Sequence, residues 1–293
     1  MNQSEEFLWV EKYRPRKIND TGLPYELKTV FQQFIDQDNI PNLILSGGPG
    51  VGKTTVARAM LEEINADYII INGSMHGNID TLRNEIMQFA SSVSFQGGRK
   101  YVILDEADYL NANSTQPALR NFMEEFSKNC GFILTCNFKN RIISPLHSRC
   151  SVIDFSIKSQ EKPKLASEFF EKIKAILDME SITYDDKVVA AFIQKHFPDW
   201  RRVLNELQRY SATGTIDTGI LTDLQDVSIK KLVESMKSKN YTNVRKWVAE
   251  NINNDSTRIF RTFYNSANDL FKGNSVPQLI LILADYQYKA AFV

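Results

Sequence analysis

Residues 47–54 read GGPGVGKT, that is Gly47, Gly48, Pro49, Gly50, Val51, Gly52, Lys53 and Thr54. This is the complete pattern G-x-x-x-x-G-K-[S/T], set between an apolar run and a helical pattern. In such a turn, successive backbone N–H groups can face phosphate oxygens, helped by the positive end of the following helix. The stretch therefore predicts a binding site for a nucleoside triphosphate.

Two side chains of this loop have predicted roles at the triphosphate. Lys53 is expected to reach the β- and γ-phosphates, and the hydroxyl of Thr54 is expected to bind Mg²⁺. A plain glycine-rich turn is the alternative, but it does not explain why a Lys-Thr pair opens the helix that follows.

The first half of the chain alternates short apolar runs with helical patterns. Short apolar strands that are separated by helices predict a parallel sheet covered on both faces. Ser114 is a favourable N-cap for one helix, and Pro117 falls in its first turn, where proline is tolerated. The expected strands are 43–45, 68–71, 101–104, 132–135 and 152–155, and the expected helices between them lie near 54–64, 81–90 and 114–126.

The patterns after about residue 156 are helical. We expect an α/β nucleotide-binding domain over 1–157 and two all-α domains over 158–222 and 223–293. The last residues, 290–293, continue an apolar helical pattern, so we expect this end to pack against a partner subunit or against further helices.

Composition limits the classes of function. The chain has 35 basic and 35 acidic residues, so its net charge of zero offers no bulk basic field for nucleic acid. Residues 1–6 lack the apolar core of a signal peptide, and the densest apolar stretch, 279–284, is too short to cross a bilayer. The three cysteines have no metal-binding spacing and are expected to be reduced core thiols. We therefore expect a soluble, cytoplasmic protein with no membrane partner.

An acidic pair follows the apolar run 101–104. In phosphate-loop enzymes the first acid, here Asp105, holds Mg²⁺, and the second, here Glu106, can polarise the attacking water as a general base. Two acids at the end of a buried strand are costly unless a cation neutralises them. Asn137 ends the apolar run 132–136; if the two strands are neighbours, its amide is expected to face the γ-phosphate or the water.

The order of these motifs resembles the AAA+ ATPases, and within them the sliding-clamp loader subunits of the type found in T4-like bacteriophages. Cellular replication factor C small subunits are the next nearest in pattern. Residues 9–15, WVEKYRP, are similar to the N-terminal signature of clamp loaders, and residues 148–150, SRC, resemble their arginine-finger motif. Residues 197–201, FPDWR, resemble the lid segment that carries a second sensor arginine.

The resemblance implies a RecA-like AAA+ module followed by a helical lid and a helical collar, and it implies ATP with Mg²⁺ as the ligand. By the resemblance, further residues that bind the nucleotide are Val10, Tyr13, Arg14, Pro15 and Thr55.

The resemblance also implies roles for several arginines. Arg149 would act on the ATP of a neighbouring subunit, and Arg201 would contact the γ-phosphate of its own subunit, although Arg202 could exchange roles with it. Arg120 would relay DNA and subunit contacts to the acidic pair, with a structural ion pair as the alternative. Arg83 would touch a DNA phosphate without reading bases, with a solvated side chain as the alternative.

The implied function is that of an ATPase subunit of a DNA polymerase clamp loader. By the same resemblance, such a protein would join a ring or spiral of about five subunits, including a non-identical small subunit. ATP binding would drive opening of a ring-shaped sliding clamp, and primer-template DNA would trigger hydrolysis and clamp release. Three alternatives stay open: another AAA+ DNA remodeller such as a Holliday-junction motor or helicase loader, a phosphotransferase, and an assembly subunit that binds ATP without hydrolysing it.

Overall fold

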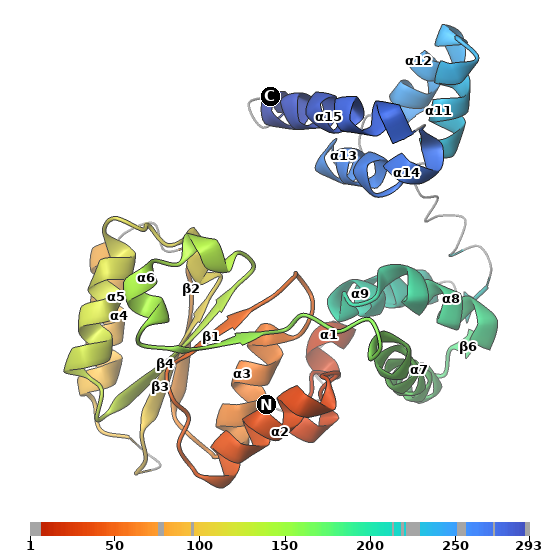
Figure 1. Cartoon of the computed structure of the whole chain (residues 1–293). Coiled ribbons are helices and arrows are strands. Elements are labelled where there is room, and N and C mark those ends of the chain that lie inside the picture. The colour runs from red at the N-terminus through yellow and green to blue at the C-terminus, as the bar shows by residue number, and fades with distance from the viewer. Residues whose placement is uncertain are drawn as a thin grey trace. The chain divides into compact units, whose positions relative to one another are not determined.

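The structure is a computed structural model of residues 1–293. The chain forms two compact units, Met1–Ile220 and Leu221–Val293 (Figure 1). The structure describes residues 7–75, 79–94, 97–212, 214–217, 220, 229–250, 256–271 and 273–290.

The first unit contains a five-stranded parallel sheet with the strand order β2-β3-β4-β1-β5. This confirms the predicted parallel sheet. The last strand starts and ends one residue earlier than expected. Since β4 lies between β1 and β3, the carboxyl ends of these three strands meet at one edge of the sheet. The strands are β1 (Leu43–Ser46), β2 (Tyr68–Asn72), β3 (Lys100–Asp105), β4 (Cys130–Cys136) and β5 (Ser151–Asp154).

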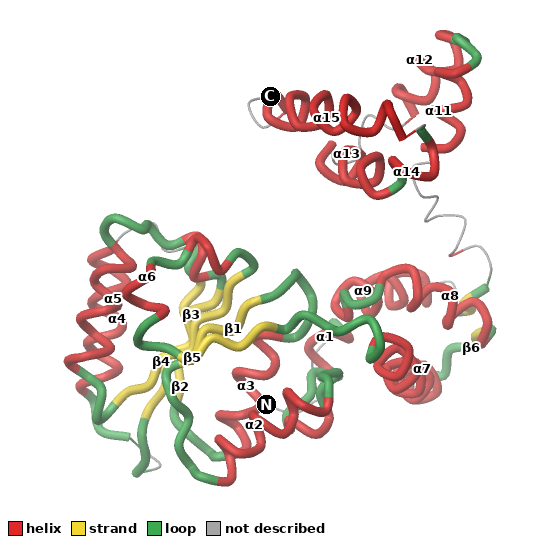
Figure 2. Tube along the Cα trace, in the orientation of Figure 1, coloured by secondary structure: helices red, strands yellow, loops and turns green. Residues whose placement is uncertain are grey.

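Helices cover both faces of this sheet, as Figures 1 and 2 show. Alternate strand residues point to opposite faces. Leu43 and Leu45 therefore pack with α2 and α3, while Ile44 packs with α4, α5 and α6. The helices and short turns of this part are α1 (Trp9–Lys12), η2 (Ile18–Asp20), α2 (Tyr25–Asp36), α3 (Lys53–Glu63), α4 (Ile79–Ser91), η3 (Ala107–Tyr109), α5 (Thr115–Glu125), η4 (Lys139–Arg141) and α6 (Ser144–His147).

The start of α5 differs from the prediction in one respect. Ser114 occupies the N-cap position, but its side chain makes no cap hydrogen bond. An N-cap side chain accepts from the second or third backbone N–H of the helix. The third helical residue is Pro117, which has no N–H, and the N–H of Gln116 already donates to the carbonyl of Asn111. The predicted role of the Ser114 hydroxyl was therefore wrong.

The remainder of the first unit is a helical lid with α7 (Lys162–Met179), α8 (Asp186–His196) and α9 (Trp200–Ser211). Two strands of two residues each, β6 (Thr183–Tyr184) and β7 (Thr215–Ile216), pair in parallel beside these helices. The sequence predicted only helices here, because a two-residue strand is too short to show the alternation that identifies a strand.

The second unit is helical throughout the residues that the structure describes. Its elements are α11 (Ile229–Lys237), α12 (Tyr241–Glu250), α13 (Ser256–Asn265), α14 (Ala267–Leu270), η5 (Gly273–Ser275) and α15 (Val276–Ala290). Residues 291–293, where an apolar end was predicted, lie outside the described residues. An α/β module followed by mainly helical regions agrees with the fold class that the sequence predicted, apart from the two short strands of the lid.

The cysteines and the apolar helices bear on two of the expectations from composition. Cys130, Cys136 and Cys150 are free and buried, as predicted, and burial raises the pKa of the Cys136 thiol to about 11. In the parts of the chain that the structure describes, no helix is long and apolar enough to cross a bilayer.

Candidate nucleotide-binding site

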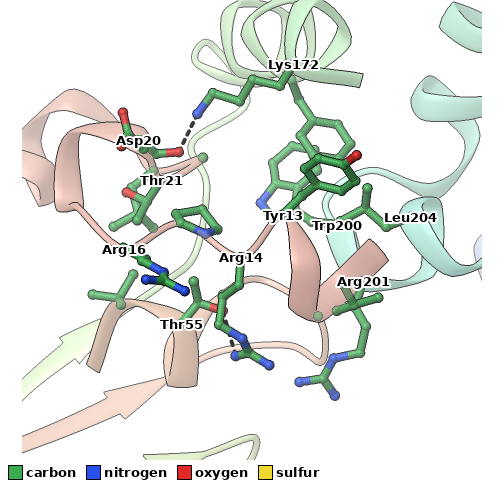
Figure 3. Close-up of a pocket in the computed structure, with 18 of the residues that line it drawn as sticks. Tyr13, Arg14, Arg16, Asp20, Thr21, Thr55, Lys172, Trp200, Arg201 and Leu204 are labelled. Carbon is green, nitrogen blue, oxygen red and sulfur yellow. Dashed lines mark hydrogen bonds between the residues drawn. The ribbon is translucent and has the colours of Figure 1, made fainter. Parts of the chain in front are cut away.

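A cavity of about 850 Å³ lies in the first unit between the N-terminal segment, the loop after β1 and the lid (Figure 3). Its apolar end is lined by lid side chains such as Phe169, Ile176 and Trp200. The predicted nucleotide-binding residues that line it are Val10, Tyr13, Arg14, Pro15, Gly50, Val51, Gly52, Lys53, Thr54, Thr55 and Arg201. The cavity has a size suited to a nucleotide, because ligand pockets typically measure about 300–1,000 Å³.

The loop 47–52 joins β1 to α3, in the strand–turn–helix order that the motif predicted. Gly50 has φ +70° and Gly52 has φ +95°, in the left-handed region that favours glycine. Gly52 is the N-cap residue of α3, so Lys53 and Thr54 stand in the first turn of the helix. The N–H of Gly47 donates to the carbonyl of Cys136, which ties the start of the loop to β4.

Lys53 is the first residue of α3, and its side chain is buried against the loop. Its ammonium donates to the carbonyl oxygens of Gly47 and Gly48 at 2.8 and 2.7 Å, and to Oδ1 of Asn137 at 2.9 Å. Burial lowers the pKa of Lys53 below its ordinary value. The predicted sensor amide and the predicted phosphate-binding lysine are therefore in direct contact.

Asp105 is the last residue of β3, and its carboxylate accepts hydrogen bonds from two hydroxyl groups. The hydroxyls of Thr54 and Thr135 each donate to its Oδ1 at 2.6 Å. Mg²⁺ prefers oxygen ligands and is typically held by one or two carboxylates together with substrate phosphates. The oxygens of Thr54 and Asp105 therefore form a donor set that fits Mg²⁺. Sequence reasoning missed Thr135, although a polar residue within the apolar run 132–136 was a usable signal.

Glu106 follows Asp105 at the edge of the sheet. Its φ of 55° and ψ of 43° lie in the left-handed region, which is uncommon for a residue other than glycine. Its N–H donates to the hydroxyl of Thr135 at 3.1 Å, and its side chain is half-buried. Backbone strain of this kind is concentrated at functional sites, where surrounding contacts hold it in place.

The N-terminal segment 12–14 makes hydrogen bonds both to the lid and to α3, which follows the loop. The Tyr13 hydroxyl and the Lys12 ammonium donate to Oε1 of Glu180, at 2.5 and 2.6 Å, at the end of lid helix α7. Arg14 donates to the Thr55 hydroxyl at 3.3 Å, beside the loop. Sequence reasoning missed Glu180, because no local pattern marks it.

The lid also touches the loop itself. The N–H of Trp200 donates to the carbonyl of Gly50 at 3.2 Å, and the Asp199 side chain caps α9 by accepting from the N–H of Arg202 at 3.0 Å. Arg201 lines the cavity, whereas Arg202 is not among the lining residues. Figure 3 shows the guanidinium of Arg201 on the side of the cavity that carries Arg14.

Three predicted arginines lie away from the cavity. Arg149 follows α6 and contacts Glu124 of α5, and Arg120 lies one helical turn before Glu124 on the same helix. Arg83 is exposed on α4. The structure therefore does not bring these side chains to the nucleotide pocket of their own subunit.

Residues 43–158 match the family model of the ATPase family associated with various cellular activities (AAA), and residues 161–222 match the model of the sliding-clamp-loader large subunit, AAA+ ATPase lid domain.

Individual proteins of known type are similar over most of the chain as well. The chain is 39% identical to the sliding-clamp-loader large subunit of Escherichia phage RB69, covering 83% of this chain and 77% of that protein. It is also 39% identical to the corresponding subunit of Enterobacteria phage T4, with 84% and 78% coverage, and 37% identical to the replication factor C small subunit of Natronomonas pharaonis, with 72% and 64% coverage.

The fold is also found in a solved structure of the Thermotoga maritima RuvB Holliday junction branch migration motor. The TM-score is 0.57, at 18% identity, over 76% of this chain and 78% of that one. At this identity the likeness is one of fold alone.

Proposed function

The chain belongs to the family of sliding-clamp-loader large subunits within the AAA+ ATPases, and we propose that it is an ATPase subunit of a DNA polymerase clamp loader. The observation that carries the proposal is the convergence of Lys53, Thr54, Asp105 and Asn137 at one edge of the sheet, beside a cavity of nucleotide size. A phosphate loop, an acidic strand end and a polar strand end are the parts that phosphoryl transfer needs.

ATP would bind with its triphosphate on the loop and its base at the apolar end of the cavity. The Lys53 ammonium is held by neutral oxygens of Gly47, Gly48 and Asn137. A phosphate oxygen would supply a charged acceptor there, and hydrogen bonds to charged acceptors are about twice as strong as neutral ones. Val10, Tyr13, Arg14 and Pro15 line the cavity and would surround the base.

Mg²⁺ would be held by Thr54 and Asp105 together with the phosphates. When bound, it would neutralise charge that develops on the transferred phosphoryl group. Glu106 would accept a proton from the attacking water as the general base. Asn137 would orient that water or contact the γ-phosphate, because its amide lies next to the Lys53 ammonium.

Two arginines would complete the site. Arg201 lines the cavity and would contact the γ-phosphate of its own subunit, which makes it a better candidate for the lid sensor than Arg202. Arg149 would reach the ATP of a neighbouring subunit, since it lies away from the cavity of its own chain. A guanidinium supplied in this way can increase turnover by about 10³–10⁵.

The partners follow from the same assignment. We propose a hetero-oligomer of about five subunits that contains a non-identical small subunit and acts on a ring-shaped clamp. Arg83 would contact the phosphate backbone of primer-template DNA, and Arg120 would relay DNA binding to the acidic pair. The predicted division into an AAA+ domain (1–157), a lid (158–222) and a collar (223–293) is part of this proposal.

The test is steady-state ATP hydrolysis by the chain with its small subunit, measured with and without clamp and primer-template DNA. Strong stimulation that needs both the clamp and DNA is the expected result. Turnover that is indifferent to the clamp, with all partners present, would instead indicate a general AAA+ DNA remodeller. Transfer of the phosphoryl group to an acceptor other than water would indicate a phosphotransferase.

A further inference from the structure

The guanidinium of Arg149 is engaged within its own subunit. Its Nε donates to Oε1 of Glu124 at 2.8 Å, and one terminal nitrogen donates to the same oxygen. The other terminal nitrogen donates to the carbonyl of Pro145 at 3.0 Å and to the hydroxyl of Ser148 at 3.2 Å. All three nitrogens therefore have partners on the chain that carries them.

Packing fixes the backbone on both sides of this contact. The Gln116 amide of α5 donates to the carbonyl of Arg141 and accepts from the N–H of Ile143, which holds the start of α6 against α5. The buried thiol of Cys150 contacts the Met123 sulfur at 3.9 Å. Arg149 lies between these two anchors, so its approach to α5 is set by the fold and not by the two side chains alone.

Glu124 has a second cationic neighbour. The Nε of Arg120 lies 3.9 Å from the same carboxylate oxygen, one turn earlier on α5. The side chains of Arg149, Arg120 and Glu124 are 31%, 46% and 51% exposed, so the cluster is at the surface and accessible to another molecule. The arginines, Arg149 foremost, lower the pKa of Glu124 below its ordinary value of 4.5.

A carboxylate and a phosphate would compete for this guanidinium. While Glu124 is in contact, its charge largely cancels that of Arg149, and it occupies the Nε edge that recognises an anion bidentately. A finger that serves a phosphate must therefore leave its carboxylate partner. Arg120 is placed to remain with Glu124 once Arg149 has left, so the carboxylate would not lose its cation.

We propose that Glu124 is a positioning residue for Arg149. Glu124 holds the Arg149 guanidinium against its own subunit and competes for it with the phosphate of the neighbouring subunit. When Arg149 binds that phosphate, Glu124 keeps its ion pair with Arg120 alone. This rests on the proposed function, in which Arg149 serves a neighbouring ATP. The contact restrains turnover until subunit assembly, with clamp and DNA, makes the phosphate the better partner.

The experiment compares Glu124→Gln with Glu125→Gln in the complete complex with the small subunit. Glu125→Gln removes the same charge from the next, exposed position of α5. We expect Glu124→Gln to raise turnover without clamp and DNA by about two- to five-fold, the range for loss of a partly exposed ion pair. Stimulated turnover should change less, so the stimulation ratio falls. Glu125→Gln should match the parent chain.

The double variant Glu124→Gln with Arg149→Ala separates this role from a merely structural one. It should behave as Arg149→Ala alone, because Glu124 acts through the guanidinium. Unstimulated turnover of Glu124→Gln at or below that of Glu125→Gln, or a gain that persists in the double variant, would overturn the proposal. If Arg149→Ala itself keeps parent turnover, the finger assignment in the proposed function fails instead.

Discussion

The Thr54 hydroxyl lies 2.6 Å from Oδ1 of Asp105, although the two residues are 51 positions apart in the chain. Thr54 belongs to the first turn of α3 and Asp105 to the last position of β3, and the Thr135 hydroxyl of β4 donates to the same oxygen. Three elements thus converge on one carboxylate oxygen beside the phosphate loop, and this contact underlies the proposed Mg²⁺ site.

Asp105→Asn tests that site by removing the charge while keeping the size. We expect the Mg²⁺ concentration for half-maximal ATP turnover to rise by at least about tenfold, because even the loss of an outer-shell partner of a metal ligand typically costs about 10–100-fold. Titration of turnover with Mg²⁺ measures this. Asp36→Asn, at the exposed end of α2, is the control, and an unchanged Mg²⁺ requirement in Asp105→Asn would contradict the assignment.

Glu106→Gln tests the proposed general base. The amide keeps the shape of the carboxylate but cannot take a proton from water. Turnover should fall by about 10²–10⁴, the usual contribution of general base catalysis, while ATP binding stays close to that of the parent. Turnover and equilibrium nucleotide binding are measured on the same preparation. A loss of binding that matches the loss of turnover would show a structural effect instead.

Mixing two inactive variants tests whether Arg149 acts between subunits. Arg149→Ala alone should lower stimulated turnover by about 10³ or more. An assembly mixed from Arg149→Ala and Glu106→Gln chains contains interfaces where an intact Glu106 meets an intact Arg149. We expect turnover of the mixture to exceed that of either variant alone. No gain on mixing, with assembly verified by size-exclusion chromatography, would mean that the arginine serves its own subunit or none.

Gly50→Ala tests the contact between the loop and the lid. A Cβ at Gly50 would lie 1.8 Å from the Asp199 carboxylate, whereas a Cβ at Gly52 would meet nothing within 4 Å. Both positions have positive φ, so each alanine should cost about 1–2 kcal/mol of backbone strain. We expect Gly50→Ala to weaken ATP binding more than Gly52→Ala, because only Gly50→Ala displaces the lid. Equal losses of affinity would contradict a role in ATP binding for the contact between Gly50 and the lid.

The hydrogen bonds that Lys12 and Tyr13 donate to Glu180 predict a dependence of stability on pH. Hydrogen bonds from Lys12 and then Tyr13 lower the pKa of Glu180 below its ordinary value of 4.5. A carboxyl group whose pKa is lowered by folding stabilises the protein above its unfolded pKa and loses this as pH falls through the folded pKa. Glu180→Gln should therefore be less stable than the parent at pH 7, and the difference should shrink as the pH falls below 4.5, through the lowered pKa of the folded state.

Urea unfolding of both proteins across this pH range measures the effect. Glu171→Gln, an exposed position on the same helix, is the matched control. A stability difference that is the same at pH 7 and at pH 3.5 would mean that Glu180 contributes packing and no charge.

The sequence by itself determined the parts of this protein whose chemistry is local. The phosphate loop needs glycines and a lysine at fixed positions within one short stretch, so Lys53 and Thr54 could be identified from eight residues. The strands of the sheet could be located because buried parallel strands are short, continuous apolar runs. The family resemblance rested on such contiguous stretches as well.

The tertiary structure alone decided which distant groups meet. Thr135 reaches Asp105 only because β4 pairs with β3, and Glu180 reaches Tyr13 only because the lid helix ends beside the N-terminal segment. Glu124 faces Arg149 because Gln116 and Cys150 hold α6 and β5 against α5. A side chain's hydrogen-bond partner depends on strand order and on how helices pack, and neither leaves a repeating pattern in the residues themselves.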